Sequence, residues 1–242
     1  MNAIETTGLT KRYKDVTAVR DLNLTVAAGE LFALLGVNGA GKTTTNKMIS
    51  CLTRPTAGDA LLLGKSIVRE PEAVKGLIAV SPQETAVAPK LTVRENLELM
   101  AGIHALSRSA AAEKVAALSE AFGLTEVLGR PAGKLSGGWQ RRLSIAMALV
   151  LEPKILFLDE PTLGLDVLAR AELWEQIRAL KGKITIILTT HYMEEAEALS
   201  DRIGIMGRGQ LLRVGTAGEL KAAVGAGSLE EAFIALAKEG LK

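Results

Sequence analysis

The stretch Gly36-Val37-Asn38-Gly39-Ala40-Gly41-Lys42-Thr43 decides the fold. It fits the pattern G-x-x-x-x-G-K-[ST], a loop whose backbone N–H groups wrap nucleotide phosphates. The apolar run 31–35 comes directly before it, and a helix is predicted from about residue 41 to residue 52. A buried strand, a glycine loop and a helix in this order are the context that a phosphate loop requires. The sequence therefore predicts an α/β nucleotide-binding fold.

Alternating strand patterns precede the loop. Residues 3–9 and 22–26 alternate apolar and polar side chains, and Leu22, Leu24 and Val26 fall on one side of the second segment. Successive side chains of a strand point to opposite faces of its sheet. The alternation therefore predicts half-buried, antiparallel strands near the N-terminus.

Strand and helix signals alternate through the rest of the chain. Further strands are predicted at residues 60–63, 77–81, 155–158, 184–188, 202–206 and 210–214, with helices at 167–181 and 193–199. Between about 88 and 152 the pattern is helical: Thr92 and Glu95 form a capping box, Ser109 is the expected cap of a second helix, and a third helix spans about 138–151. The tail, about residues 228–242, has the pattern of an amphipathic helix. The layout predicts an α/β core with a helical insertion.

Size and composition exclude several classes of protein. The 242 residues suffice for one domain with an inserted subdomain. With 29 basic and 27 acidic side chains, the charge is too balanced for binding nucleic acid by bulk charge, so no nucleic-acid partner is expected. No apolar run reaches the roughly 18 residues of a membrane span. Cys51 is the single cysteine, which excludes an internal disulfide and favours a reducing, cytosolic location.

Two carboxylates follow a second apolar strand. Asp159 and Glu160 come directly after residues 155–158. Buried carboxylates are costly without a cation or hydrogen bonds, and ligands of open α/β sheets lie at the carboxyl ends of parallel strands. We therefore expect Asp159 to hold Mg²⁺ directly or through water, and Glu160 to activate the water that attacks the γ-phosphate. The alternative is that both merely cap the turn at Pro161 and Thr162.

A second glycine-rich helix start distinguishes this chain from simpler phosphate-binding proteins. In Leu135-Ser136-Gly137-Gly138, Ser136 can cap a helix or bind a phosphate oxygen, and the glycines leave backbone N–H groups uncovered. Taken alone, such a start is usually only a cap. A P-loop kinase or GTPase would leave it unexplained, and no Asn-Lys-x-Asp guanine-reading motif follows the phosphate loop.

Together these motifs resemble the ATP-binding subunit of an ABC transporter over essentially the whole chain, most of all the bacterial type-2 exporter ATPases. Residues 36–43 match Walker A, 155–159 match Walker B with Glu160 as catalytic base, and 135–138 match the family signature. In the same comparison Gln83 corresponds to the Q-loop glutamine, Asp166 to the D-loop aspartate, His191 to the switch histidine and Tyr13 to the ring that stacks on adenine. Trp139 departs from the usual glutamine of the signature.

The resemblance implies a P-loop NTPase (RecA-like) core with an N-terminal antiparallel β subdomain and an inserted α-helical subdomain. The chain would be one domain, with its core at about 1–87 and 153–227, the insertion at about 88–152 and a C-terminal helix at about 228–242. Two ATP-binding subunits, identical or closely homologous, would pair head to tail so that each phosphate loop faces the signature of the other. A separate polytopic membrane permease would hold the pair at the cytoplasmic side of the cell membrane.

The resemblance also assigns the site residues. ATP would be held by Tyr13, Gly36, Val37, Asn38, Gly39, Ala40, Gly41, Lys42, Thr43 and Thr44, and the ATP of the other subunit by Ser136, Gly137 and Gly138. Mg²⁺ would be held by Thr43, Gln83 and Asp159, with Glu160 and His191 in catalysis and Asp166 in the D-loop. Alternatively, His191 is a satisfied polar residue at a strand end and Tyr13 serves packing only. Arg141 and Arg142 are expected to form a solvated helix face.

Two alternatives to a transport ATPase differ in class. One is an ABC-type ATPase with a non-membrane partner, as in iron–sulfur assembly; chromosome-maintenance relatives are excluded because no long coiled coil separates Lys42 from Asp159. The other is the P-loop kinase or GTPase considered above. Export rather than import is expected because segments 91–97 and 228–233 resemble exporter ATPases. The transported substrate is not encoded in this chain, since the permease selects it.

Overall fold

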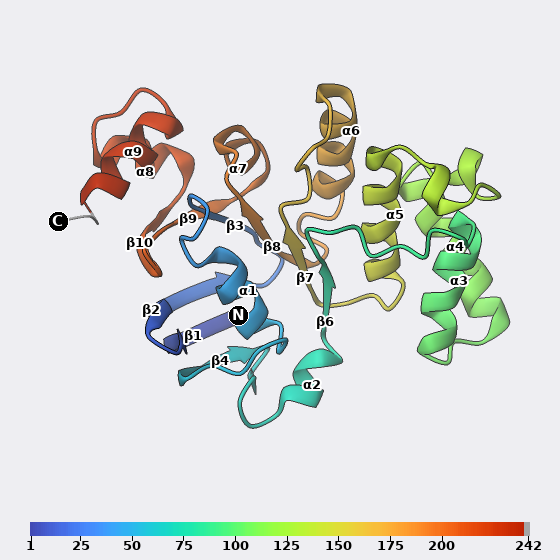
Figure 1. Cartoon of the computed structure of the whole chain (residues 1–242), viewed down its shortest axis with the longest axis horizontal. Coiled ribbons are helices and arrows are strands. Elements are labelled where there is room, and N and C mark those ends of the chain that lie inside the picture. The colour runs from blue at the N-terminus through green and yellow to red at the C-terminus, as the bar shows by residue number, and fades with distance from the viewer. Residues whose placement is uncertain (240–242) are drawn as a thin grey trace.

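Two β-sheets and a group of helices make up the computed structural model, which describes residues 1–239 (Figure 1). The first sheet has the strand order β2-β1-β4-β5 and is antiparallel. The second has the order β10-β9-β3-β8-β7-β6 and is parallel except for β10 at its edge. The predicted mixed α/β architecture with an N-terminal antiparallel sheet is confirmed.

The antiparallel sheet is formed mainly by β1 (Asn2–Tyr13) and β2 (Val16–Ala27). β4 (Ala57–Leu62) pairs with β1, and the short β5 (Lys65–Ser66) completes the sheet. Leu22, Leu24 and Val26 are buried while Asn23 and Thr25 are exposed, as the alternating pattern predicted. One face of this sheet therefore packs on the rest of the molecule and the other faces solvent.

The parallel sheet contains the strands that precede the phosphate loop, Glu160 and His191. β3 (Leu31–Leu35) lies at its middle, between β9 (Arg202–Gly207) and β8 (Thr185–Thr190). β7 (Ile155–Asp159) and β6 (Ile78–Ser81) follow on one side, and the antiparallel β10 (Gln210–Gly215) closes the other. Every residue of β3, β7 and β8 is buried. The unbroken apolar run of β3 predicted its burial, whereas β8 also buries the polar residues Thr185, Thr189 and Thr190.

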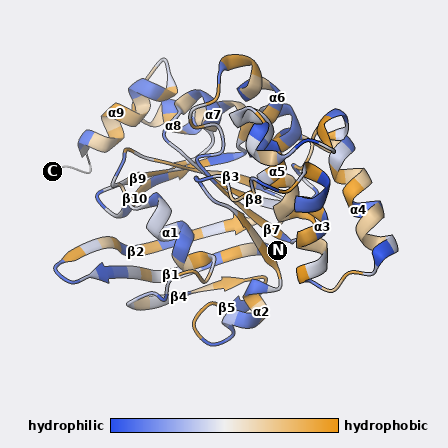
Figure 2. Ribbon diagram, turned by 45° about the vertical axis from the view of Figure 1, so that its right-hand side comes forward, coloured by the Kyte–Doolittle hydropathy of each residue, from blue (hydrophilic) through white to orange (hydrophobic). Residues whose placement is uncertain are grey.

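Helix α1 (Lys42–Ile49), which follows the phosphate loop, lies between the two sheets (Figures 1 and 2). Met48 and Ile49 on this helix share one apolar core with Ile4 of β1 and Phe32 of β3. Burial on both sides fixes the start of the helix, because well-packed cores do not deform continuously. The loop that precedes α1 is thus held at the carboxyl end of β3.

The other helices flank the parallel sheet. α3 (Val93–Ile103), α4 (Arg108–Ala121) and α5 (Gly137–Leu149) gather beyond β6, in green and yellow at the right of Figure 1. The remaining helices are α2 (Pro71–Lys75), α6 (Val167–Arg178), α7 (Met193–Leu199), α8 (Ala217–Ala223) and α9 (Leu229–Glu239), with 3₁₀ turns at Thr125–Val127 and Ala132–Lys134. None of these described helices is long and apolar enough to cross a bilayer.

Helix caps test the sequence predictions most closely. The capping box of Thr92 and Glu95 is present at α3. The expected cap of α4 is wrong: Ser107, not Ser109, accepts a hydrogen bond from the backbone N–H of Ala110 at 3.3 Å. Helix α8 was not predicted, although Thr216 is its N-cap and forms a second capping box. The predicted C-terminal helix is present as α9, and its expected end at 240–242 lies outside the described residues.

Candidate nucleotide-binding and hydrolysis site

The phosphate loop ends at a helix start that no side chain caps. Gly41 is the N-cap of α1 and has the left-handed φ of 104°. A Cβ at this position would lie 2.7 Å from the carbonyl oxygen of Ala18, so a residue other than glycine would both strain the backbone and clash with β2. The uncapped N–H groups of the first helical turn make a binding site for an anion.

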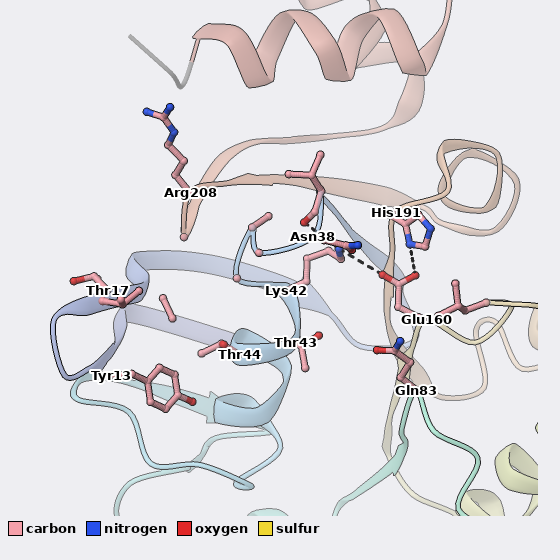
Figure 3. Close-up of a pocket in the computed structure, with 18 residues that line it drawn as sticks. Tyr13, Thr17, Asn38, Lys42, Thr43, Thr44, Gln83, Glu160, His191 and Arg208 are labelled. Atoms are coloured by element: carbon pink, nitrogen blue, oxygen red, sulfur yellow. Dashed lines mark hydrogen bonds and ion pairs between the residues drawn. The ribbon is translucent and has the colours of Figure 1, made fainter.

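A cavity of about 650 Å³ opens beside this helix start (Figure 3). It brings together nearly all the predicted phosphate-loop residues and four of the predicted residues from other segments, Tyr13, Gln83, Glu160 and His191. The phosphate-loop residues that line it are Val37, Asn38, Gly39, Ala40, Gly41, Lys42, Thr43 and Thr44. Tyr13, 45% exposed at the end of β1, lines the far end of the cavity. Gly36 instead lines a neighbouring hollow with His191 and Phe233.

The carboxylate of Glu160 faces two nitrogen-bearing side chains inside this cavity (Figure 3). Its Oε2 lies 2.7 Å from His191 Nδ1, and its Oε1 lies 3.5 Å from Lys42 Nζ. Lys42 also donates a hydrogen bond of 2.6 Å to the carbonyl oxygen of Gly36. These side chains follow β7, β8 and β3, which are consecutive parallel strands, so they meet at one edge of the sheet.

Oxygen donors for a divalent cation lie at the same place. Thr43 and Gln83 line the cavity, and Asp159 is buried at the end of β7. Among the described residues, Asp159 does not line the cavity; it accepts a hydrogen bond from the Thr189 hydroxyl. A hydroxyl, an amide and a carboxylate suit Mg²⁺, which keeps several waters and takes further ligands from phosphates. The residues at this place therefore have the oxygen donors that this ion requires.

The second glycine-rich motif lies at a separate place. Ser136, Gly138 and Asp166 line a hollow of about 250 Å³, and none of its described lining residues belongs to the phosphate-loop cavity. Gly137 is the first residue of α5. Ser136 occupies the N-cap position of α5 but makes no capping hydrogen bond through its side chain. Its hydroxyl and the first N–H groups of α5 are thus available to another group.

Several residues that line the cavity were not predicted from the sequence. They are Val16, Thr17 and Ala18 at the start of β2, Leu163 after β7, and Arg208 and Gly209 in the turn between β9 and β10. Gly209 donates a backbone hydrogen bond of 3.0 Å to the carbonyl of Ala40 in the phosphate loop. This contact joins segments far apart in the chain, so no local pattern signals it.

The expected solvated face of Arg141 and Arg142 is wrong. Both side chains are buried, and burial lowers the pKa of each guanidinium from its ordinary value. Arg142 forms an ion pair with Glu172 and lies over the ring of Trp139, 4.9 Å from its centroid. Arg141 points to the sheet instead. Burial overrides their polarity because α5 is covered on several sides by other elements.

Residues 19–163 match the family model described as ABC transporter. The chain belongs to the ABC transporter family. It is 43% identical over 228 residues to the daunorubicin/doxorubicin resistance ATP-binding protein DrrA of Streptomyces peucetius, an alignment that covers 94% of this chain and 69% of that protein.

Two solved structures show how far the likeness in fold extends. The structure of an ATP-binding subunit of an ABC transporter superposes with a TM-score of 0.85 at 32% identity, covering 97% of this chain and 99% of that one. The dimeric post-hydrolysis structure of the ATP-binding cassette MJ0796, bound to ADP and phosphate, gives a TM-score of 0.79 at 25% identity, covering 88% and 98%. This ABC transporter subunit therefore has the P-loop NTPase fold, binds ATP and is an ATPase that works with membrane components.

Proposed function

We propose that this subunit hydrolyses ATP with Glu160 as the general base that activates the attacking water. The arrangement that carries the proposal is the Glu160 carboxylate between His191 Nδ1 at 2.7 Å and Lys42 Nζ at 3.5 Å, inside the phosphate-loop cavity. The loop N–H groups and Lys42 would bind the phosphates. His191 would orient the carboxylate and contact the γ-phosphate.

The remaining site residues take roles that follow from their positions. Mg²⁺, when bound, would offset phosphate charge, and Thr43, Gln83 and Asp159 are the groups suited to hold it. Tyr13 is an exposed ring at the far end of the cavity, which supports stacking on adenine.

The site of one chain is completed by a second chain in this proposal. The separation of the signature hollow from the phosphate-loop cavity supports a head-to-tail pair, in which Ser136, Gly137 and Gly138 contact ATP on the partner. Asp166 lines the signature hollow and would lie at the same interface. The uncapped start of α5 would offset γ-phosphate charge from the side opposite Lys42.

At the level of the transporter, we propose that the pair drives export of a drug through a polytopic permease, docked at the cytoplasmic side of the cell membrane. Likeness to the resistance protein DrrA supports both the direction and the class of substrate. The chain would act as one ATPase domain with its core at about 1–87 and 153–227, the helical insertion at about 88–152 and the terminal helix after it. The competing proposal is a non-membrane partner.

The variant Glu160→Gln tests the catalytic assignment. It keeps the size of the side chain but removes the base, so we expect ATP binding to persist while turnover falls by about 10²–10⁴-fold. Steady-state ATPase assays and nucleotide titration measure the two effects. Glu175→Gln, an exposed change on α6, is the matched control and should leave both unchanged. Undiminished hydrolysis by Glu160→Gln would refute the assignment.

Purification from membranes tests the transport assignment. A tagged chain expressed with the genes beside its own should co-purify with a polytopic membrane protein. Cells carrying both should accumulate less of a fluorescent anthracycline than cells carrying Glu160→Gln. Recovery of a purely soluble partner would contradict the transport proposal, and equal drug accumulation would contradict drug export.

A further inference from the structure

Arg141 lies where α5 meets the carboxyl ends of two neighbouring strands. Its side chain is only 4% exposed, although arginine is among the residues least often buried. The guanidinium donates hydrogen bonds of 2.6 Å to the carbonyl oxygens of Pro82 and Gln83, which follow β6. It donates a third, of 3.3 Å, to the carbonyl oxygen of Glu160, which follows β7. One side chain therefore joins the start of α5 to two loops of the site.

The chemistry of these contacts is specific to arginine. A buried cation is costly unless hydrogen bonds satisfy it, and all three acceptors are backbone carbonyls rather than carboxylates. A planar guanidinium can donate to several acceptors at fixed angles, whereas an ammonium group is a compact point charge. Asp159 and Glu195 lie close enough to favour the charged form without pairing with it. The Arg141 side chain thus fixes the backbone after β6 and the backbone after β7 relative to each other.

One of those segments has a strained backbone. Glu160 has a φ of 49°, in the left-handed region that residues other than glycine rarely adopt. Such a conformation persists only where the surroundings fix it. On one side the N–H of Glu160 donates to the carbonyl of Thr189 at 3.0 Å, and on the other side its carbonyl accepts from Arg141. These two contacts hold the backbone from which the Glu160 carboxylate projects.

We propose that Arg141 is a positioning residue that couples the start of α5 to the carboxylate of Glu160 and to the loop of Gln83. This inference rests on the proposed catalytic role of Glu160. α5 begins with Gly137 directly after Ser136, so a displacement of this helix start displaces Arg141 and, through it, the backbone of Glu160. Engagement of the signature residues is thereby linked to the geometry of the base on the same chain.

The alternative is that Arg141 only stabilises the fold. Arg202 provides a matched control for that role, because it also ties separate elements together through Glu30 and the carbonyl of Thr25. Arg202 lies at the start of β9, beside Phe32 near the start of β3, so it is at the edge of the parallel sheet opposite the site. A loss of stability at either arginine is expected; a loss of catalysis is expected only at Arg141.

The first experiment compares Arg141→Gln and Arg141→Lys with Arg202→Gln in the full chain. We expect kcat for ATP to fall by about tenfold to a hundredfold in both Arg141 variants, as for small misplacements of catalytic groups. The dissociation constant for ATP should change by less than about twofold, because Lys42 and the loop are untouched. Arg202→Gln should keep its kcat. Equal loss of kcat in Arg202→Gln, or unchanged kcat in Arg141→Lys, would overturn the proposal.

A second experiment combines each Arg141 change with Glu160→Gln. If Arg141 acts through Glu160, its substitution should lower the residual single-turnover rate of the Glu160→Gln protein by less than about twofold, whereas independent effects would multiply. Multiplication of the two losses would overturn the proposal. If Glu160→Gln alone kept full activity, the proposed function would fail instead, so the two failures are distinguishable. Should Arg141→Gln not fold, Arg141→Lys carries both experiments.

Discussion

Three acidic side chains near the ends of β7 and β8 differ in their partners although all are buried. Asp159 accepts from the Thr189 hydroxyl, and Glu160 faces Lys42 and His191. Glu195, on α7, accepts hydrogen bonds from the Thr162 hydroxyl at 2.7 Å and the Trp174 indole at 3.2 Å. Burial raises the pKa of Glu195 above its ordinary value, and these donors oppose the rise only in part. Its environment therefore favours the protonated, neutral form.

The raised pKa of Glu195 predicts how stability depends on pH. The folded chain binds the Glu195 proton more tightly than the unfolded chain does, and this difference contributes to the free energy of unfolding. The contribution is fully present below the ordinary pKa of 4.5 and is lost as pH rises through the pKa of Glu195 in the folded chain. Glu195→Gln keeps the acceptor oxygen but cannot ionise. We expect wild type to lose free energy of unfolding relative to this variant as pH rises above 4.5, measured by urea denaturation. A difference that stays constant with pH would contradict the prediction.

At the scale of the element, local sequence signals were sufficient to predict most of the strands and helices. The phosphate loop was predictable because glycine spacing and the flanking apolar run are both local. The buried side of α5 was not predictable, because Arg141 and Arg142 are polar residues. Their side chains are covered only once β6, β7 and α6 pack around the helix. The place of Arg208 and Gly209 in the cavity was not predictable for the same reason: it depends on a tertiary contact, the backbone hydrogen bond from Gly209 to Ala40.

The misassigned cap of α4 yields a direct test. Ser107 accepts from the N–H of Ala110, whereas Ser109 hydrogen-bonds to the hydroxyl of Ser107. We expect Ser107→Ala to lower the free energy of unfolding by about 1 kcal/mol, since it leaves a helix N–H without its partner. Ser109→Ala should cost no more than a few tenths of that amount and serves as the matched control. Urea denaturation of both variants measures the difference. A larger loss of the free energy of unfolding in Ser109→Ala than in Ser107→Ala would support Ser109 as the cap.

At the scale of the whole molecule, sequence motifs identified the two halves of the proposed site but not their separation. Both glycine-rich segments begin helices without a side-chain cap, and uncapped N–H groups at a helix start favour an anion. The structure sets α1 between the two sheets and α5 beyond β6, so the two hollows have no lining residue in common within residues 1–239. Motif spacing along the chain does not specify this distance, because it depends on how the helical segment packs against the parallel sheet.

Pairing of two chains is the property that this separation predicts. Ser136→Arg places a bulky cation at the start of α5, outside the phosphate-loop cavity. ATP binding to the isolated chain should therefore remain, while ATP-dependent pairing should be lost because the side chain obstructs the partner's nucleotide and repels its Lys42. Sedimentation in the Glu160→Gln background, where ATP persists, measures pairing. Thr125→Arg adds the same charge on the exposed 3₁₀ turn and should still pair. If the Ser136→Arg chain paired as readily as the Thr125→Arg chain, Ser136 would have no role on the other subunit.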